Sequence, residues 1–186
     1  NEAVIARTIS AAIPDETALF VSSSRPIRDL EGFAVPRDGV VTYANRGLAG
    51  IDGNISTALG IAYSHKATIA ILGDLSFLYD LTGLINKEDI NCRFIVINND
   101  GGGIFSTLPQ RGSHGFETVF GTPHGLNPAE IAKSMGISAK QISSLKELEA
   151  EVKAPISGIS VVVCDVPDRE SNADNLKAIY TSLNSM

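Results

Sequence analysis

The chain has 186 residues, of which 44% are hydrophobic and 19% charged, and its formal net charge is −6. This length and composition are typical of one folded, soluble domain with a sizeable core rather than of a disordered chain. The negative charge argues against a nucleic-acid surface, which needs basic stripes, and no apolar run approaches the ~20 residues of a membrane span. The chain starts within a helical pattern and without a signal peptide, so we expect it to be part of a longer protein.

In chain order, short apolar runs alternate with helical patterns. Several runs are apolar at successive positions, which is typical of parallel strands covered on both faces. Helix starts are indicated by Asn127 before Pro128 and by Ser144 with Glu147, a capping box. We expect strands at 18–22, 40–44, 67–72, 93–98 and 159–166, with a further short strand at 139–143, and helices at 53–65, 76–86, 127–136, from 144 onward and at 171–186.

This alternation predicts an α/β fold, a three-layer α/β/α sandwich with a mostly parallel sheet, in which residues 1–186 form a single domain. Ligands in such folds bind at the carboxyl ends of the strands. The long irregular segment 100–126 is expected to be functional or disordered. The strand ends, which are also glycine-rich and polar, lie at 22–28, 45–53, 73–76 and 98–105.

Two cysteines, Cys92 and Cys164, sit in or beside apolar strands, and neither has metal-type spacing. We interpret them as buried, reduced thiols, which favours a cytoplasmic protein. His65, His114 and His124 receive no role.

Asp74 follows one predicted strand and Asn99 follows the next, 99 − 74 = 25 positions later. One helix and a returning parallel strand fit this spacing, so both residues are expected at the same edge of the sheet. An aspartate carboxylate, an asparagine amide oxygen and the peptide carbonyl of Gly101 form a set of hard oxygen ligands that suits Mg²⁺ bound to a phosphate. The glycines at 101–103 let the backbone approach a ligand closely.

Other interpretations exist for each stretch alone. Asp74 could simply cap the next helix through Ser76 and its neighbours, and "NNDGGG" could be an ordinary turn. A Rossmann-type nucleotide site is disfavoured, because Gly47, Gly50 and Gly53 do not have the required spacing. A non-catalytic regulatory module on the same fold is a further alternative.

Gly73-Asp74, followed by Asn98-Asn99, resembles the thiamine diphosphate signature of thiamine-dependent enzymes, with Leu75 where Gly is usual. Together with "NRGLAGIDG", "GDLSFLYDL" and "NNDGGGIFSTLP", it resembles the 2-succinyl-5-enolpyruvyl-6-hydroxy-3-cyclohexene-1-carboxylate synthases of menaquinone biosynthesis. The resemblance covers only their carboxyl-terminal, diphosphate-binding third. An acetolactate synthase-like enzyme is the nearest alternative within the thiamine enzymes.

The resemblance implies roles for individual residues. Asp74, Asn99 and the Gly101 carbonyl would bind Mg²⁺ or Mn²⁺. Arg28 and Arg46 would face substrate carboxylates, which suit planar guanidinium groups, whereas Arg25 is expected to be a solvated surface charge. Ile104 and Phe105 would wall the reacting centre, and Ile51 would support the bent cofactor. The residues expected to bind thiamine diphosphate are Ser24, Gly50, Ile51, Gly73, Asp74, Leu75, Ser76, Asn99, Gly101, Gly102, Gly103 and Ile104.

The resemblance also implies a transferase reaction, in which 2-oxoglutarate is decarboxylated and the succinyl semialdehyde carbanion adds to isochorismate. The glutamate that serves the aminopyrimidine ring would come from the amino-terminal domain of a second subunit in a homodimer or homotetramer. We therefore expect this chain to need its missing amino-terminal domains for activity, and to bind neither nucleic acid nor membrane.

Overall fold

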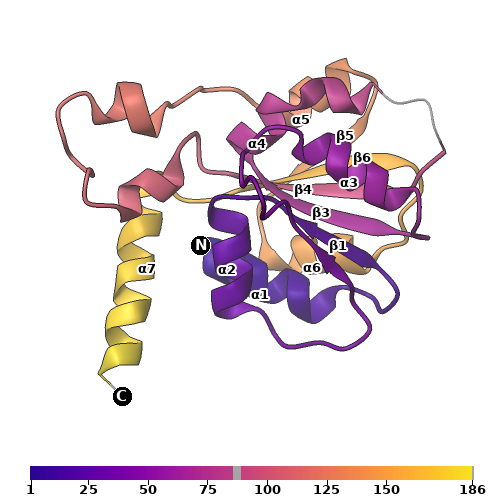
Figure 1. Ribbon diagram of the computed structural model, residues 1–186, viewed down its shortest axis with the longest axis horizontal. Helices are drawn as coiled ribbons and strands as arrows, with labels where there is room; N and C mark the ends of the chain where they lie inside the picture. Colours follow the sequence, from indigo (N-terminus) through magenta and orange to yellow (C-terminus); the bar gives the residue numbers. More distant parts are fainter. Residues whose placement is uncertain (86–88, 186) are drawn as a thin grey trace.

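Parallel strands form the central sheet of the computed structural model, which describes residues 1–85 and 89–185 (Figure 1). The strand order β2-β1-β3-β4-β6-β5 requires crossovers, and helices supply them. The strands are β1 (Ala18–Val21), β2 (Thr42–Tyr43), β3 (Thr68–Gly73), β4 (Cys92–Asn98), β5 (Ser138–Ile142) and β6 (Ile159–Asp165). The predicted α/β sandwich and each predicted strand, including the short one at 139–143, are confirmed.

Helices cover both faces of this sheet (Figure 1). One face carries α1 (Glu2–Ala12), α2 (Arg25–Phe33) and α6 (Leu145–Lys153). The other carries α3 (Asn54–Ala62), α4 (Asp74–Tyr79) and α5 (Pro128–Ser134). The sequence analysis did not predict α2, whose sequence contains both Pro26 and Gly32.

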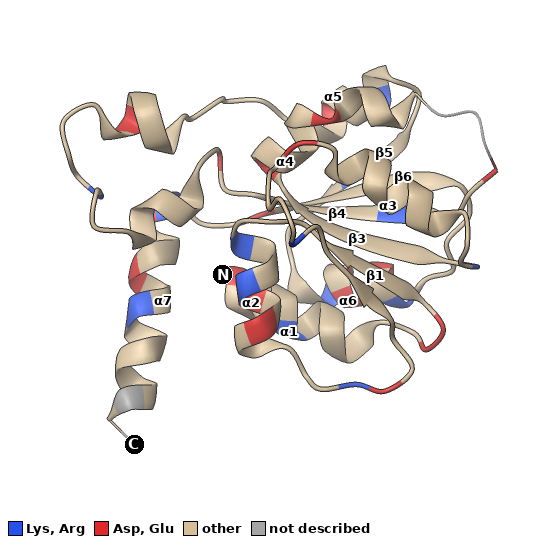
Figure 2. Ribbon diagram, in the orientation of Figure 1, with Lys and Arg blue, Asp and Glu red and all other residues tan. Residues whose placement is uncertain are grey.

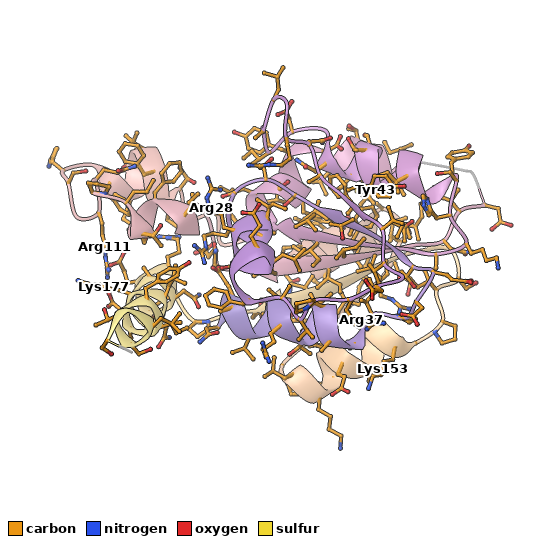
Figure 3. The ribbon with its side chains drawn as sticks, turned by 60° about the horizontal axis from the view of Figure 1, so that its bottom comes forward. Arg28, Arg37, Tyr43, Arg111, Lys153 and Lys177 are labelled. Carbon is orange, nitrogen blue, oxygen red and sulfur yellow. The ribbon has the colours of Figure 1, made fainter. Side chains whose placement is uncertain are left out.

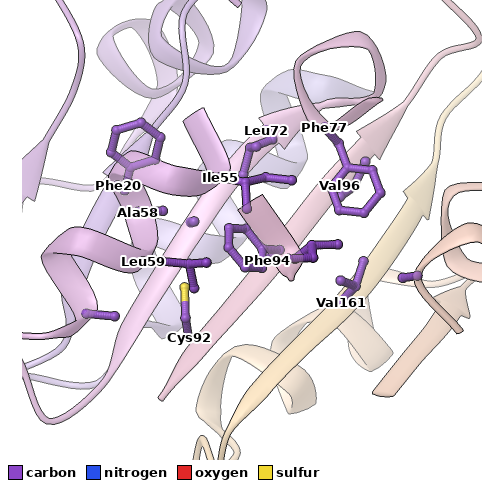
Figure 4. Packing of buried hydrophobic residues seen from close by; sticks show 14 of the residues in the cluster. Phe20, Ile55, Ala58, Leu59, Leu72, Phe77, Cys92, Phe94, Val96 and Val161 are labelled. Carbon is purple, nitrogen blue, oxygen red and sulfur yellow. The ribbon is translucent and has the colours of Figure 1, made fainter. Parts of the chain in front are cut away.

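The core divides into two clusters because successive side chains of each strand point to opposite faces. Figure 4 shows the cluster on the α3 side, where Phe20, Leu72, Phe94 and Val96 from the strands pack with Phe77 of α4. Cys92 and Cys164 are buried free thiols, as predicted. Burial raises the pKa of both, that of Cys164 to about 12, so neither thiol is reactive at neutral pH.

The predicted helix 76–86 is wrong in its extent. It begins two residues earlier, as α4, and ends at Tyr79, after which a short 3₁₀ helix, η1 (Leu81–Leu84), follows. The Asp80 carboxylate accepts hydrogen bonds from the backbone N (2.7 Å) and Oγ (3.1 Å) of Ser56, and this contact with α3 turns the chain out of the helix. Ile85, within the range of the predicted helix, lies after η1 and is 74% exposed, and residue 86 lies outside the described residues.

The carboxyl-terminal helix α7 (Arg169–Asn184) extends away from the sandwich, and the segment 103–121 lies beside it (Figure 1). α7 starts two residues before the predicted position, because Asp168 caps it by accepting a hydrogen bond from Ser171 N (2.9 Å). Within the segment lie the 3₁₀ helix η2 (Gly103–Thr107) and the π-helix η3 (Glu117–Gly121). In the part of the chain that the structure describes, no helix combines the length and the apolar character needed to cross a membrane.

Candidate functional site

Asp74 lies where β3 gives way to α4, and only 2% of it is exposed. Its Oδ1 accepts a hydrogen bond from Leu75 N (2.7 Å), as expected for a carboxylate that starts a helix. Its Oδ2 accepts from Asn99 N (3.2 Å) and Gly101 N (2.8 Å), both in the turn after β4. The two neighbouring strand ends therefore converge as predicted. The alternative that Asp74 caps the helix is not borne out, because Gly73 occupies the N-cap position and Asp74 is the first residue of α4.

The nitrogen and the oxygen of the Asn99 side-chain amide have different surroundings. Its Nδ2 donates to Glu2 Oε1 at 2.8 Å. Its Oδ1 is buried, and no donor in residues 1–85 or 89–185 reaches it. Buried polar atoms rarely stay unpaired, so this oxygen is suited to a ligand such as a cation.

The glycines of this turn are needed for close packing. A Cβ on Gly101, whose φ is +129°, would lie 2.1 Å from Gly121 O, and one on Gly102 would lie 2.1 Å from Phe120 O. The segment around η3 thus packs directly on the turn, and Gly102 N donates to Gly121 O at 2.7 Å. Besides leaving room for a ligand, these glycines let the 116–122 segment close over the strand ends.

A cavity of about 340 Å³ opens at these strand ends. Ser76 Oγ donates to Ile51 O at 3.0 Å and so ties the loop after β2 to α4 beside it. Gly50 is not part of the lining, although its neighbours Ala49 and Ile51 are. The predicted residues that line the cavity are Ser24, Ile51, Gly73, Asp74, Leu75, Ser76, Asn99, Gly101, Gly102, Gly103, Ile104 and Phe105.

Of the three arginines considered, Arg25 lines this cavity, whereas Arg28 and Arg46 do not. Arg28 is exposed, donates to Ser24 O at 2.6 Å and lines a second groove of about 880 Å³ between α2 and α7 (Figure 3). Arg46 is exposed on the loop after β2 and lines neither hollow. Figure 2 shows that α2 and α7 each carry both signs of charge.

The expectation that Arg25 is a solvated surface charge is wrong. Only 11% of its side chain is exposed, because it pairs with Glu2 at 3.2 Å and with Asp29, four residues later on α2. Arg28, rather than Arg25, is the exposed arginine of this helix.

His124 belongs to the site, although the sequence analysis gave it no role. Its Nε2 lies 3.2 Å from Asp74 Oδ2, and its Nδ1 accepts from Leu126 N at 3.0 Å. Because Nδ1 accepts a hydrogen bond, the ring proton is on Nε2, which donates a hydrogen bond to the Asp74 carboxylate. Asp100 fixes this loop by accepting from His124 N (3.0 Å) and Gly125 N (2.7 Å). The contact joins residues 50 positions apart, and His124 lies in an irregular segment, so no local pattern could have revealed it.

Among the described residues, no group of three or more His, Cys, Asp or Glu side chains could hold a metal ion. A cation at this site would therefore depend on Asp74, on amide and peptide oxygens and on oxygens supplied by its ligand. Asn99, whose backbone N donates to Asp74, has a buried and unpartnered Oδ1 that fits such a mixed set.

A family model described as "Thiamine pyrophosphate enzyme, C-terminal TPP binding domain" matches residues 33–166. Curated relatives named 2-succinyl-5-enolpyruvyl-6-hydroxy-3-cyclohexene-1-carboxylate synthase are 42% identical in Thermobifida fusca (80% of this chain, 28% of the relative) and 42% in Bacillus cytotoxicus (92% and 30%). The same named protein of Staphylococcus aureus strain JH9 is 39% identical over 92% of this chain and 31% of the relative. The chain thus spans less than a third of these relatives.

The fold also matches a solved structure of a candidate thiamin diphosphate-dependent enzyme isolated from Mycobacterium smegmatis. The TM-score is 0.70 at 22% identity, over 90% of this chain and 32% of that one. At this identity the likeness supports the fold alone.

Proposed function

Because this chain belongs to the family of carboxyl-terminal TPP-binding domains of thiamine pyrophosphate enzymes, we propose that it is the diphosphate- and metal-binding domain of a 2-succinyl-5-enolpyruvyl-6-hydroxy-3-cyclohexene-1-carboxylate synthase. The observation that carries the proposal is the meeting of Asp74 with the Asn99–Gly101 turn at the ends of β3 and β4. The curated relatives supply the choice among thiamine enzymes.

Asp74, Asn99 Oδ1 and the Gly101 carbonyl would hold Mg²⁺ or Mn²⁺, which in turn would hold the diphosphate. A helix N-terminus stabilises an anion by at most ~2 kcal/mol, whereas two unit charges 4 Å apart contribute about 4 kcal/mol at an effective dielectric of 20. A divalent cation therefore outweighs the dipole of the short helix α4. It also removes the repulsion between Asp74 and phosphate, and it would compete with His124 for Oδ2.

When bound, thiamine diphosphate supplies the carbon nucleophile of the reaction. This chain would supply the cavity that holds the diphosphate end, with Ser76 beside it and Ile51 as apolar support for the bent cofactor. Ile104 and Phe105 would wall the reacting centre and exclude water from it. Phe105 is held by its ring contact with Phe120, with 5.3 Å between centroids.

Arg28 and Arg46 would bind the substrates, which we propose to be 2-oxoglutarate and isochorismate. Both are dicarboxylates, and guanidinium groups bind carboxylates through paired hydrogen bonds. Arg28 lies one helical turn from Ser24 of the cavity and also borders the α2–α7 groove, so it is placed between the two hollows. The rest of the site would come from amino-terminal domains and a second subunit, which are absent from this chain.

The test is binding of Mn²⁺ in the presence of thiamine diphosphate, followed by electron-spin resonance. We expect Asp74→Ala to lose the bound-metal signal, with an affinity loss larger than the roughly 10- to 100-fold that is typical of residues behind a ligand. Asp165→Ala is the matched control, because Asp165 ends β6 at the same edge of the sheet without lining the cavity. Calorimetry should show that thiamine diphosphate binding requires the divalent ion.

Equal thiamine diphosphate affinity with and without the divalent ion would remove the metal from the mechanism. A bound-metal signal that persists in Asp74→Ala would favour a non-catalytic module on the same fold.

A further inference from the structure

Glu2, in the first turn of α1, contacts the proposed metal ligand Asn99 across 97 positions of sequence. Only 6% of Glu2 is exposed. One carboxylate oxygen accepts from Asn99 Nδ2 (2.8 Å), and the other accepts from Arg25 Nε (3.2 Å). Arg25 in turn pairs with the buried Asp29. A continuous chain of ionic and hydrogen bonds thus runs from α2 through α1 to the turn after β4.

This contact determines which way the Asn99 amide faces. An ionised carboxylate only accepts hydrogen bonds, so it pairs with the NH₂ group of an amide and repels the amide oxygen. Turning the amide over would place Oδ1 against Glu2 and leave Nδ2 where Oδ1 is now buried without a donor. An amide nitrogen cannot ligate a hard cation, so the observed orientation is the one that suits metal binding.

Two further features hold this arrangement. Arg25 offsets the charge of Glu2, which makes its burial tolerable. Gly103 leaves the space that the amide occupies, since a Cβ there would lie 2.4 Å from Asn99 Nδ2 and 3.0 Å from its Cγ. The Asn99 amide therefore contacts the charged Glu2 on one side and fits against Gly103, which has no side chain, on the other.

We propose that Glu2 is a positioning residue for the metal site, which orients the Asn99 amide so that Oδ1 is offered to the divalent cation. This inference rests on the proposed function and extends it to α1. Residues that orient metal ligands typically change metal affinity by about 10- to 100-fold when removed.

The test measures Mn²⁺ affinity in the presence of thiamine diphosphate, together with the urea midpoint of unfolding, for the full 186-residue chain. We expect Glu2→Ala to lower Mn²⁺ affinity by about 10- to 100-fold. Glu2→Gln can still accept from Asn99 Nδ2 through its amide oxygen, so it should recover most of that loss. Gly103→Ala should lower the affinity independently by displacing the amide from the other side. Glu130→Ala, which removes an exposed carboxylate from the first turn of α5, should leave the affinity unchanged.

A Glu2→Ala chain that binds Mn²⁺ as tightly as the wild type would overturn the inference and leave the proposed function intact. A wild-type chain that binds no Mn²⁺ with thiamine diphosphate would overturn the proposed function, and the inference with it. If Glu2→Ala lowers the urea midpoint of unfolding, its loss of affinity could reflect lost stability, so Glu2→Gln and Gly103→Ala then provide the test. Unchanged Mn²⁺ affinity in Gly103→Ala, or no recovery in a folded Glu2→Gln, would overturn the inference.

Discussion

At the scale of single residues, burial decides how the charges between α1 and α2 behave. Asp29 is 1% exposed, and its burial raises its pKa from 3.8 to about 7, against the opposing effect of Arg25. The carboxylate of Glu2 adds to the increase, and Arg28 opposes it. The folded protein therefore holds the Asp29 proton over a pH range in which the unfolded chain releases it.

This proton makes stability depend on pH. A pKa raised in the folded state gives stability that is complete below about pH 4 and is lost as pH rises towards about 7, by at most about 1.4 kcal/mol per pH unit. We expect the free energy of unfolding of Asp29→Asn to fall less steeply with pH than that of the wild type, as measured by urea unfolding across that pH range. Asp38→Asn, at an exposed position, should keep the wild-type slope. Identical slopes for Asp29→Asn and the wild type would contradict the prediction.

Sequence reasoning at the residue scale succeeds where a local pattern carries the information. Asp74 and Asn99 each follow an apolar strand, so parallel topology alone brings them together. Glu2 and His124 reach the same site from 97 and 50 positions away, through contacts that no spacing rule encodes. Arg25 was misjudged for two reasons. Its partner Asp29 lies four residues later on α2, a helix that was not predicted, and its partner Glu2 comes close only when α1 packs on α2.

At the scale of elements, hydrophobic pattern predicts that strands and helices exist better than it predicts where they end. Runs of buried residues identify β3, β4 and β6, whereas the end of α4 is set by the tertiary contact between Asp80 and Ser56. Capping signals are local, and the predicted starts at Asn127 and Ser144 are correct.

The end of α6, which lies just before Pro155, is also capped by a distant residue, Arg93 of β4. Its guanidinium donates to the carbonyls of Glu151, Ala154 (2.9 Å) and Pro155 (3.1 Å), so it closes the carboxyl end of the helix from within the sheet. These carbonyls have no partner inside the helix, and a cation there also complements the helix dipole. Arg93 itself is buried, and its three hydrogen bonds to carbonyls explain why a charged residue occurs in an otherwise apolar strand.

We expect Arg93→Ala to lower the free energy of unfolding by about 3 kcal/mol or more, because it removes three charge-assisted hydrogen bonds to part-buried carbonyls at the end of α6. Arg93→Lys should lose less, since one ammonium group can still reach part of the set. Arg7→Ala, at an exposed position on α1, should change stability by no more than about 0.5 kcal/mol. Urea denaturation measures all three, and an Arg93→Ala change as small as that of Arg7→Ala would contradict the capping role.

At the scale of the whole molecule, the α/β sandwich differs in its contribution to folding from the part formed by segment 103–121 and α7. Two buried clusters on the two faces of the sheet give the chain a core of its own, so we expect it to fold without further domains. Arg169 of α7 donates to Asp100 O at the strand ends and so joins α7 to the sandwich. Arg111 pairs with Glu170 and Asp174, and these ion pairs join the segment 103–121 to α7. The cavity lies where the sandwich meets the segment 103–121.

The isolated chain is therefore expected to bind thiamine diphosphate weakly and not to catalyse turnover. The family resemblance assigns the glutamate for the aminopyrimidine ring to an amino-terminal domain, and this chain spans less than a third of its curated relatives. The measurement is steady product formation from 2-oxoglutarate and isochorismate with Mg²⁺, for the chain alone and after adding the amino-terminal two thirds of a relative. Turnover should appear only in the mixture, and Asp74→Ala in this chain should abolish it there. Steady turnover by the chain alone would show that the ring-binding half of the site is not required.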